Sequence, residues 1–152
     1  SKKNGTVGCV VLDKQGNLTA GTSTGGMFKK RWGRIGDSPV IGAGTYADNN
    51  SCAVSCTGHG EYFIRHAVAF DVCARYKYLK ESVEKAADYI IHTELNTNAG
   101  NGGLIAVDKL GNIAMPYNSG GMFRGFLYKE KGRPEIKKGC GIGKKIVVVG
   151  EK

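Results

Sequence analysis

The sequence of 152 residues has no apolar run long enough to span a membrane, and its lysine-rich start lacks the apolar region of a signal peptide. It also lacks the Walker phosphate-binding pattern, the zinc-ligand spacings of cysteine and histidine, and the signatures of domains that read RNA or DNA. These absences argue against a membrane protein, a P-loop protein, a zinc protein and a nucleic-acid-binding protein. We therefore expect no membrane or nucleic-acid partner, no metal and no other cofactor.

Disulfide patterning is also missing. The five cysteines are odd in number, scattered along the chain and mostly set in apolar segments (Cys9, Cys52, Cys56, Cys73 and Cys140). This pattern predicts buried thiols in a reducing compartment, which indicates the cytoplasm.

Acidic residues are scarce relative to basic ones, 13 against 22, which gives a formal net charge of +9. Much of the excess lies in residues 129–152, where eight lysines and arginines face three glutamates. Because charged segments are usually solvated, we interpret residues 129–152 as a basic C-terminal tail. The excess charge has three alternative readings, which are binding to nucleic acid, to an anionic surface or to an acidic partner subunit, and the missing RNA- and DNA-reading signatures argue against the first.

Hydrophobic periodicity predicts both strands and helices in one domain. The expected strands are residues 7–12, 18–22, 40–46, 52–56 and 146–149. Apolar residues three and four apart predict two amphipathic helices over residues 61–78 and 79–94. Their expected core faces are Phe63, Ala67, Phe70, Cys73 and Ala74 in the first, and Val83, Ala86, Ala87, Ile90 and Ile91 in the second. Strands grouped around a helical pair favour an α+β layered sandwich.

The chain contains an internal repeat. Residues 11–17 (VLDKQGN) resemble residues 106–112 (AVDKLGN), and residues 25–28 and 120–123 share the letters GGMF. At the same offset, Asn101 stands in the place of Thr6 and Ser119 in the place of Thr24. We expect two equivalent β-hairpins in stacked or continuous sheets, with the chemistry confined to the first copy.

Thr6 is a candidate nucleophile at the start of the first strand. It lies between Gly5 and Gly8, ahead of an apolar run. A threonine hydroxyl needs a base, and one solution is the residue's own α-amino group when that residue opens the chain. Five residues precede Thr6 here, so either the Gly5–Thr6 bond is cleaved or Thr6 is an ordinary strand residue.

Three glycine-containing loops follow expected strands, over residues 22–26, 33–38 and 57–61. Their backbone N–H groups suit an oxyanion or a phosphate, while turn formation alone also accounts for them. Arg34 and Asp37 suit the α-carboxylate and α-ammonium of an amino acid, or else form a surface ion pair. His59 and His66 lack partners that would make them bases or ligands, so we interpret both as structural.

Several short segments, in order along the chain, are similar to one known family: residues 5–8 (GTVG), 22–27 (TSTGGM), 33–39 (GRIGDSP), 42–44 (GAG), 46–49 (YADN) and 55–61 (SCTGHGE). They resemble the β-subunit of the plant-type L-asparaginases, which are also isoaspartyl (β-aspartyl) peptidases. The resemblance extends from Thr6 to about Tyr128. It departs from the family at bulky Trp32 and in the basic tail.

The resemblance implies an N-terminal-nucleophile hydrolase with a four-layer αββα sandwich, of which this chain is the nucleophile-bearing half. It implies a precursor cleaved between Gly5 and Thr6, so that residues 1–5 are a residual segment and residues 6–128 the β-subunit. The implied partner is an α-subunit from the same precursor, in an (αβ)2 assembly. The implied substrates are L-asparagine and β-aspartyl dipeptides.

The resemblance also assigns roles to residues of this sequence. Thr6 would be the nucleophile, with its freed amine as the base, and Thr24 would assist by hydrogen bonding near Thr6. Thr57 and Gly58 would form the oxyanion hole. The substrate would be bound by Arg34, Asp37 and Gly60. The related glycosylasparaginases share segments like residues 21–24 and 34–39, although Gly26 and residues 57–61 fit the asparaginase branch better. The alternative outside catalysis is a basic binding module in which Thr6 is never freed.

Overall fold

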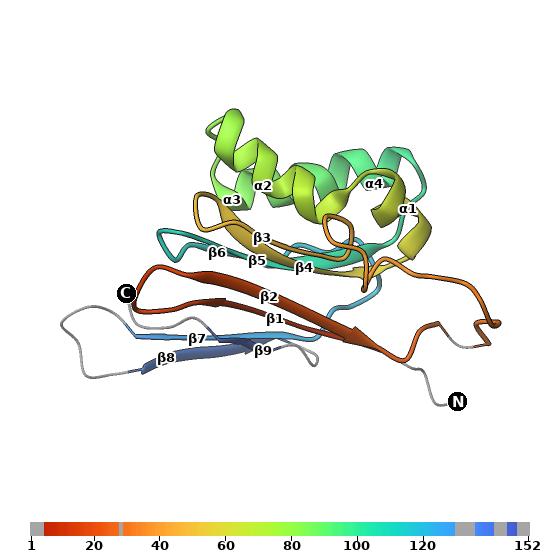
Figure 1. Cartoon of the computed structure of the whole chain (residues 1–152), viewed down its shortest axis with the longest axis horizontal. Coiled ribbons are helices and arrows are strands. Elements are labelled where there is room, and N and C mark those ends of the chain that lie inside the picture. Colours follow the sequence, from red (N-terminus) through yellow and green to blue (C-terminus); the bar gives the residue numbers. More distant parts are fainter. Residues whose placement is uncertain (1–4, 28, 130–135, 142–145, 149–152) are drawn as a thin grey trace.

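The computed structural model describes residues 5–27, 29–129, 136–141 and 146–148, and its helices all lie on one face of a β-sheet (Figure 1). That central sheet has the strand order β3-β4-β5-β6 and is antiparallel throughout. The β1–β2 hairpin and strands β7–β9 lie on its opposite side (Figure 1). The described residues thus form an α+β layered structure, as the sequence predicted. None of the described helices is long and apolar enough to cross a membrane.

The two predicted hairpins are present, and they lie in stacked sheets. Strands β1 (Thr6–Leu12) and β2 (Leu18–Thr24) form the first hairpin, and β5 (Gly102–Asp108) and β6 (Ile113–Ala114) form the second. Asp13 accepts hydrogen bonds from the backbone N–H groups of Gln15 and Asn17, and from the Asn17 side chain. Asp108 accepts the equivalent three bonds from Leu110 and Asn112. The repeat therefore preserves the turn geometry as well as the letters.

The central strands β3 (Thr45–Ala47), β4 (Cys52–Gly58) and β5 separate two apolar cores. Because side chains alternate along a strand, one face of β4 and β5 packs under the helices and the other packs against the hairpin. The second core joins Val10, Leu12 and Leu18 of the hairpin to Ala53, Ile105, Val107 and Met122. Every residue of β5 is buried, as expected for a strand covered on both faces.

The first predicted helix is interrupted. It forms α1 (Gly60–Arg65) and α2 (Val68–Tyr78), separated at Ala67, whose φ is 44° and ψ is 48°. The backbone N–H groups of residues 69 and 70 donate to the carbonyl oxygens of residues 43 and 42, which turns the chain. The predicted core face is therefore wrong beyond Phe63, except at Cys73, and α2 buries Val68, Ala69, Val72 and Cys73.

The second predicted helix begins later than expected, because Ser82 caps it. The backbone N–H of Lys85 donates to the Ser82 hydroxyl at 3.2 Å. The helix then runs through α3 (Val83–Tyr89), the π-helical turn η1 (Ile90–Glu94) and α4 (Leu95–Thr97). Its predicted core residues Val83, Ala86, Ala87, Ile90 and Ile91 are all buried.

Two other strand predictions need correction. Of residues 40–46, only the end joins β3, because the carbonyl oxygen of Asp37 accepts hydrogen bonds from the N–H groups of Val40 and Gly44 and folds residues 40–44 into turns.

In the predicted tail, β8 (Ile136–Gly141) pairs with β7 (Arg124–Lys129), and β9 (Ile146–Val148) pairs with β7 on the other side. Because backbone hydrogen bonds between strands do not require alternating apolar residues, the sequence of β8 carries no pattern that predicts a strand. Residues 1–4 of the predicted leading segment, and residues 130–135, 142–145 and 149–152 of the tail, lie outside the described residues.

Candidate active site

A pocket of about 790 Å³ lies where β1 begins and β2 and β4 end. Its size falls within the range of roughly 300–1,000 Å³ that is usual for small-molecule sites. Its lining contains every site residue predicted from the sequence: Gly5, Thr6, Thr24, Arg34, Asp37, Thr57, Gly58 and Gly60. These residues come from two β-hairpin strands, a long loop, the end of β4 and the first turn of α1.

Strand pairing brings the two candidate catalytic threonines together. Thr6 and Thr24 are register partners in the antiparallel β1–β2 ladder, and the Thr6 hydroxyl donates to the Thr24 hydroxyl at 3.2 Å. The backbone N–H of Gly26 also donates to the Thr24 hydroxyl, at 2.9 Å. By strand alternation, both threonines lie on the same side of the hairpin as buried Val10 and Leu18. Thr6 therefore faces the central sheet across the pocket.

A second hydroxyl contact lies immediately behind this pair. The Thr22 hydroxyl donates to the carbonyl oxygen of Gly44 at 3.1 Å, and its oxygen lies 2.7 Å from the hydroxyl oxygen of Ser55. Because the Thr22 hydroxyl proton is donated to the carbonyl oxygen of Gly44, the Ser55 hydroxyl is the donor to the Thr22 oxygen in the shorter contact. Ser55 is fully buried in β4, so this contact fixes the hairpin to the central sheet two residues from Thr24.

Gly58 lies at a place where a side chain has no room. Its φ is 155°, and a Cβ there would lie 2.3 Å from the carbonyl oxygen of Asn101 and 2.6 Å from the Phe63 ring. A Cβ at its register partner Gly102 would likewise lie 2.7 Å from that ring. The next backbone N–H, that of His59, donates to the Asn101 carbonyl oxygen at 2.9 Å. Close strand contact over Phe63 thus sets the backbone beside Thr57.

Asp37 also lines the pocket and is held tightly, with only 6% of its surface exposed. A Cβ at Gly60 would lie 2.9 Å from both the Asp37 backbone nitrogen and its Oδ1. A Cβ at Gly44 would lie 2.5 Å from the Asp37 carbonyl oxygen. These two glycines therefore allow the loop that carries Asp37 to pack against the start of α1 and against β3.

Arg34 is exposed at the pocket and forms no ion pair with any described residue. The surface ion pair between Arg34 and Asp37, left open by the sequence, is therefore absent, and the two groups line one cavity separately. A cation and a carboxylate that line the same pocket suit a zwitterionic amino-acid group. The hydroxyl pair of Thr6 and Thr24 lines the same pocket.

Polar residues that were not predicted as site residues also line the pocket: Lys30, Ser38, His59, Glu61, Asn101 and Ser119. Asn101 and Ser119 occupy the repeat positions of Thr6 and Thr24, so the internal repeat was a signal that pointed to them. Lys30 belongs to a run of basic residues that the sequence presents as a loop.

The two histidines singled out by the sequence differ in position. His59 lines the pocket, and the pocket-lining residues do not include His66. The Nδ1 atom of His66 lies 3.2 Å from Oε1 of Glu94, which joins the end of α1 to η1. Within the described part of the chain, no three His, Cys, Asp or Glu side chains are placed to hold a metal ion.

The predicted burial of the cysteines is confirmed for Cys52, Cys56 and Cys73, while Cys9 is half-buried. The Sγ atoms of Cys52 and Cys73 lie 2.7 Å apart under α2. The contact with Cys52 and burial together raise the pKa of Cys73 above its usual range. Cys73 therefore stays protonated at neutral pH, and neither cysteine lines the pocket.

Comparison with known proteins finds one matching family and similar proteins in several organisms. A family model described as asparaginase matches residues 1–135. The isoaspartyl peptidase of Salmonella typhimurium is 54% identical over 128 residues, which cover 84% of this chain and 41% of that protein. The isoaspartyl peptidase of Escherichia coli K12 is 49% identical over 141 residues, with 86% and 44% covered. A probable isoaspartyl peptidase/L-asparaginase of Arabidopsis thaliana is 53% identical over 120 residues, with 79% and 36% covered.

The family model covers most of the chain, and the chain therefore belongs to the asparaginase family. It spans less than half the length of these three relatives.

Proposed function

We propose that this chain is the nucleophile-bearing part of a threonine amidohydrolase that hydrolyses L-asparagine and β-aspartyl dipeptides. The observation that carries the proposal is the convergence of Thr6, Thr24, Arg34 and Asp37 on one pocket. The names of the relatives, isoaspartyl peptidase and L-asparaginase, support the same substrate class.

The first step of the proposed mechanism is cleavage of the Gly5–Thr6 bond. While Gly5 is attached, the nitrogen of Thr6 is a peptide nitrogen and has no basicity to offer. Attack of the Thr6 hydroxyl on the Gly5 carbonyl carbon breaks the C–N bond and forms an ester, and the nitrogen takes the hydroxyl proton. Water then hydrolyses this ester, leaving a Gly5 carboxylate and a free Thr6 amine that can serve as base.

In the proposed turnover, Arg34 binds the α-carboxylate of the substrate and Asp37 binds its α-ammonium beside Gly60. The Thr6 amine removes the proton of the Thr6 hydroxyl, which attacks the side-chain amide carbon and forms an acyl-enzyme. The Thr57 hydroxyl and the Gly58 N–H stabilise the developing oxyanion. Ammonia or an amino acid leaves with the proton, and water releases aspartate. Thr24, within hydrogen-bond distance of Thr6, orients the nucleophile.

The proposed whole enzyme is an (αβ)2 assembly with a four-layer αββα sandwich. The described residues supply one helical layer and the β-layers beneath it (Figure 1). A separate α-subunit is consistent with the length of this chain, which spans less than half the length of its relatives. That subunit would cover the outer face of the hairpin, where Val7 is 56% exposed at the start of β1.

The decisive experiment follows mass and turnover in the same preparation of the full-length precursor. Wild-type protein should yield a species that begins at Thr6 and should release ammonia from asparagine. Thr6→Ala should remain uncut and inactive, while Thr19→Ala, at an exposed position in β2, should behave as wild type. Hydrolysis by Thr6→Ala would refute the mechanism. A stable chain that keeps residues 1–5 and never hydrolyses asparagine would instead identify a non-catalytic binding module.

A further inference from the structure

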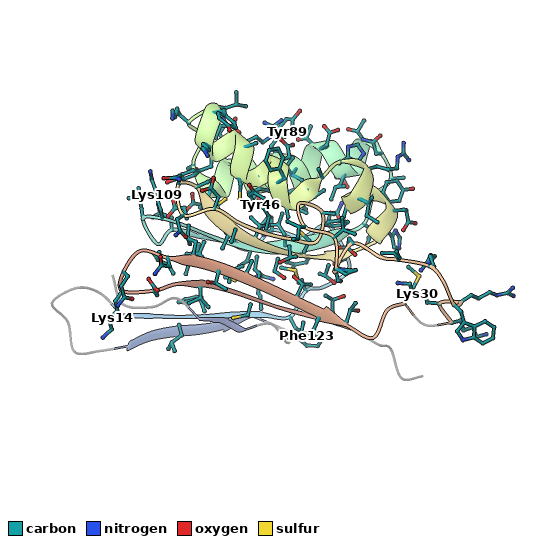
Figure 2. The ribbon with its side chains drawn as sticks, in the orientation of Figure 1. Lys14, Lys30, Tyr46, Tyr89, Lys109 and Phe123 are labelled. Carbon is teal, nitrogen blue, oxygen red and sulfur yellow. The ribbon has the colours of Figure 1, made fainter. Side chains whose placement is uncertain are left out.

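Lys30 is a pocket residue to which the proposed turnover gives no role. It follows β2 on the loop beyond the strand ends (Figure 2), and its backbone N–H donates to the Met27 carbonyl oxygen at 2.9 Å. Lys30 is half-buried, whereas its neighbours Lys29 and Arg31 are exposed and do not line the pocket. The turn at Met27 therefore directs one of three consecutive basic residues inward.

Two glycines make room for the Lys30 side chain. A Cβ at Gly26 would lie 3.0 Å from its Cδ atom, and a Cβ at Gly36 would lie 3.2 Å from its ammonium nitrogen. The ammonium therefore lies against the glycine that immediately precedes Asp37. This places it next to Asp37, which together with Arg34 forms the proposed substrate clamp, rather than in open solvent.

The charges around the pocket exceed what asparagine requires. Asparagine presents one carboxylate and one ammonium, and Arg34 and Asp37 match these two groups. Lys30, like Arg34, forms no ion pair with any described residue, so one cation is left over. The remaining acid, Glu61, is exposed at the first turn of α1.

A β-aspartyl dipeptide presents one more carboxylate than asparagine does and no further ammonium, because the nitrogen of its leaving residue is the scissile amide. We propose that Lys30 binds this carboxylate and thereby favours β-aspartyl dipeptides over asparagine. A lysine suits the task because its ammonium is a compact charge on a flexible stem, which tolerates leaving residues of different shape. The inference rests on the proposed function and assigns a second substrate subsite to the same pocket.

The test compares substrates that differ only in this carboxylate, with the matured αβ enzyme. β-Aspartyl-leucine carries it, β-aspartyl-leucine amide has lost it, and asparagine lacks the leaving residue altogether. Wild-type enzyme should show a KM about tenfold to a hundredfold higher for the amide than for the acid, the size expected for a charge-assisted contact. Lys30→Met should raise KM for the acid to that of the amide and leave asparagine within about twofold. Lys30→Arg should keep most of the discrimination, and Arg31→Met should match wild type.

Three results would overturn the inference. Equal KM values of wild-type enzyme for the acid and the amide would show that the carboxylate of the leaving residue is not recognised. A rise in KM for all three substrates in Lys30→Met would place Lys30 on the α-carboxylate with Arg34. An unchanged KM in Lys30→Met would show that it binds no substrate group. Failure of the proposed function is a separate outcome, in which wild-type enzyme hydrolyses none of the three.

Discussion

The hydroxyl oxygens of Thr22 and Ser55 lie 2.7 Å apart and join β2 to the central strand β4. Neither residue belongs to the proposed catalytic set, yet Thr22 lies on the same strand face as Thr24, two residues away. The contact therefore sets how the hydroxyl pair of Thr6 and Thr24 sits over the central sheet.

Replacing Thr22 with valine keeps the shape of the side chain and removes its hydroxyl. Ser55 is fully buried, so its hydroxyl is left without this partner, and we expect a loss of about 1–3 kcal/mol of stability. We also expect kcat for asparagine to fall while KM changes little, because the nucleophile moves and the clamp does not. Urea unfolding and steady-state kinetics measure the two effects. Thr22→Ser should restore both, and a Thr22→Val protein as stable and active as wild type would contradict the positioning role.

Gly58→Ala should damage the fold at the edge of the pocket. A Cβ would approach the Asn101 carbonyl oxygen to 2.3 Å and the Phe63 ring to 2.6 Å, and neither backbone nor buried ring can retreat freely. Overpacking of this kind costs about 1–3 kcal/mol. The comparison is Gly21→Ala in β2, where no atom lies within 4 Å of the Cβ position. Thermal unfolding should show a clear drop in Tm for Gly58→Ala alone, and equal Tm values for the two variants would refute the packing argument.

The two copies of the hairpin turn should differ in energy although their hydrogen bonds are alike. Asp108 is 1% exposed, whereas Asp13 is half-buried, so water can replace the bonds lost at Asp13 more easily than those lost at Asp108. We expect Asp108→Ala to cost about 1–3 kcal/mol, and Asp13→Ala to cost less. Urea denaturation of the two single variants gives the comparison. A larger loss at Asp13 would mean that burial does not decide the strength of the turn.

The ion pair between Asp48 and Lys77 predicts a pH dependence of stability. The two charged atoms lie 2.9 Å apart and link the turn after β3 to α2. The backbone N–H of Asn50 and then the Lys77 ammonium lower the pKa of Asp48. Contact with Asp48 in turn raises the pKa of Lys77.

The two pKa shifts determine how the free energy of unfolding changes with pH. The Asp48 contribution is fully present above the unfolded pKa of about 3.9 and is lost as the pH falls through the lower folded value. The Lys77 contribution is fully present below about pH 10.4 and is lost as the pH rises through the higher folded value. The stability difference between wild type and Asp48→Asn should therefore be constant near neutrality and shrink in acid. Urea midpoints between pH 2 and pH 7 test this, and a difference that persists unchanged to pH 2 would exclude the pair as its source.

The parts of the fold that were predicted correctly depend on neighbours along the chain. Val83, Ala86 and Ile90 share one helical face whatever packs on it, and the Asp13 turn closes on a residue four positions away. The wrong predictions involve partners far along the chain. The helix break at Ala67 depends on carbonyl groups of residues 42 and 43, and β8 forms because the backbone of β7 is available to pair with it.

The sequence by itself determined the repeated hairpins, the helical faces of residues 83–91 and the residue types that the proposed threonine amidohydrolase requires, since these follow from local periodicity and motif. Only the tertiary structure decided that Thr6 faces Thr24 across a strand pair, that Asp37 is buried beside Gly60, and that Lys30 alone of its basic neighbours enters the pocket. The reason is physical: the pocket is built from loops that are distant along the chain. These loops can approach one another because Gly26, Gly36, Gly44 and Gly60 have no Cβ atom at the points of contact. The need for glycine at these positions follows from the packed structure and not from the local sequence.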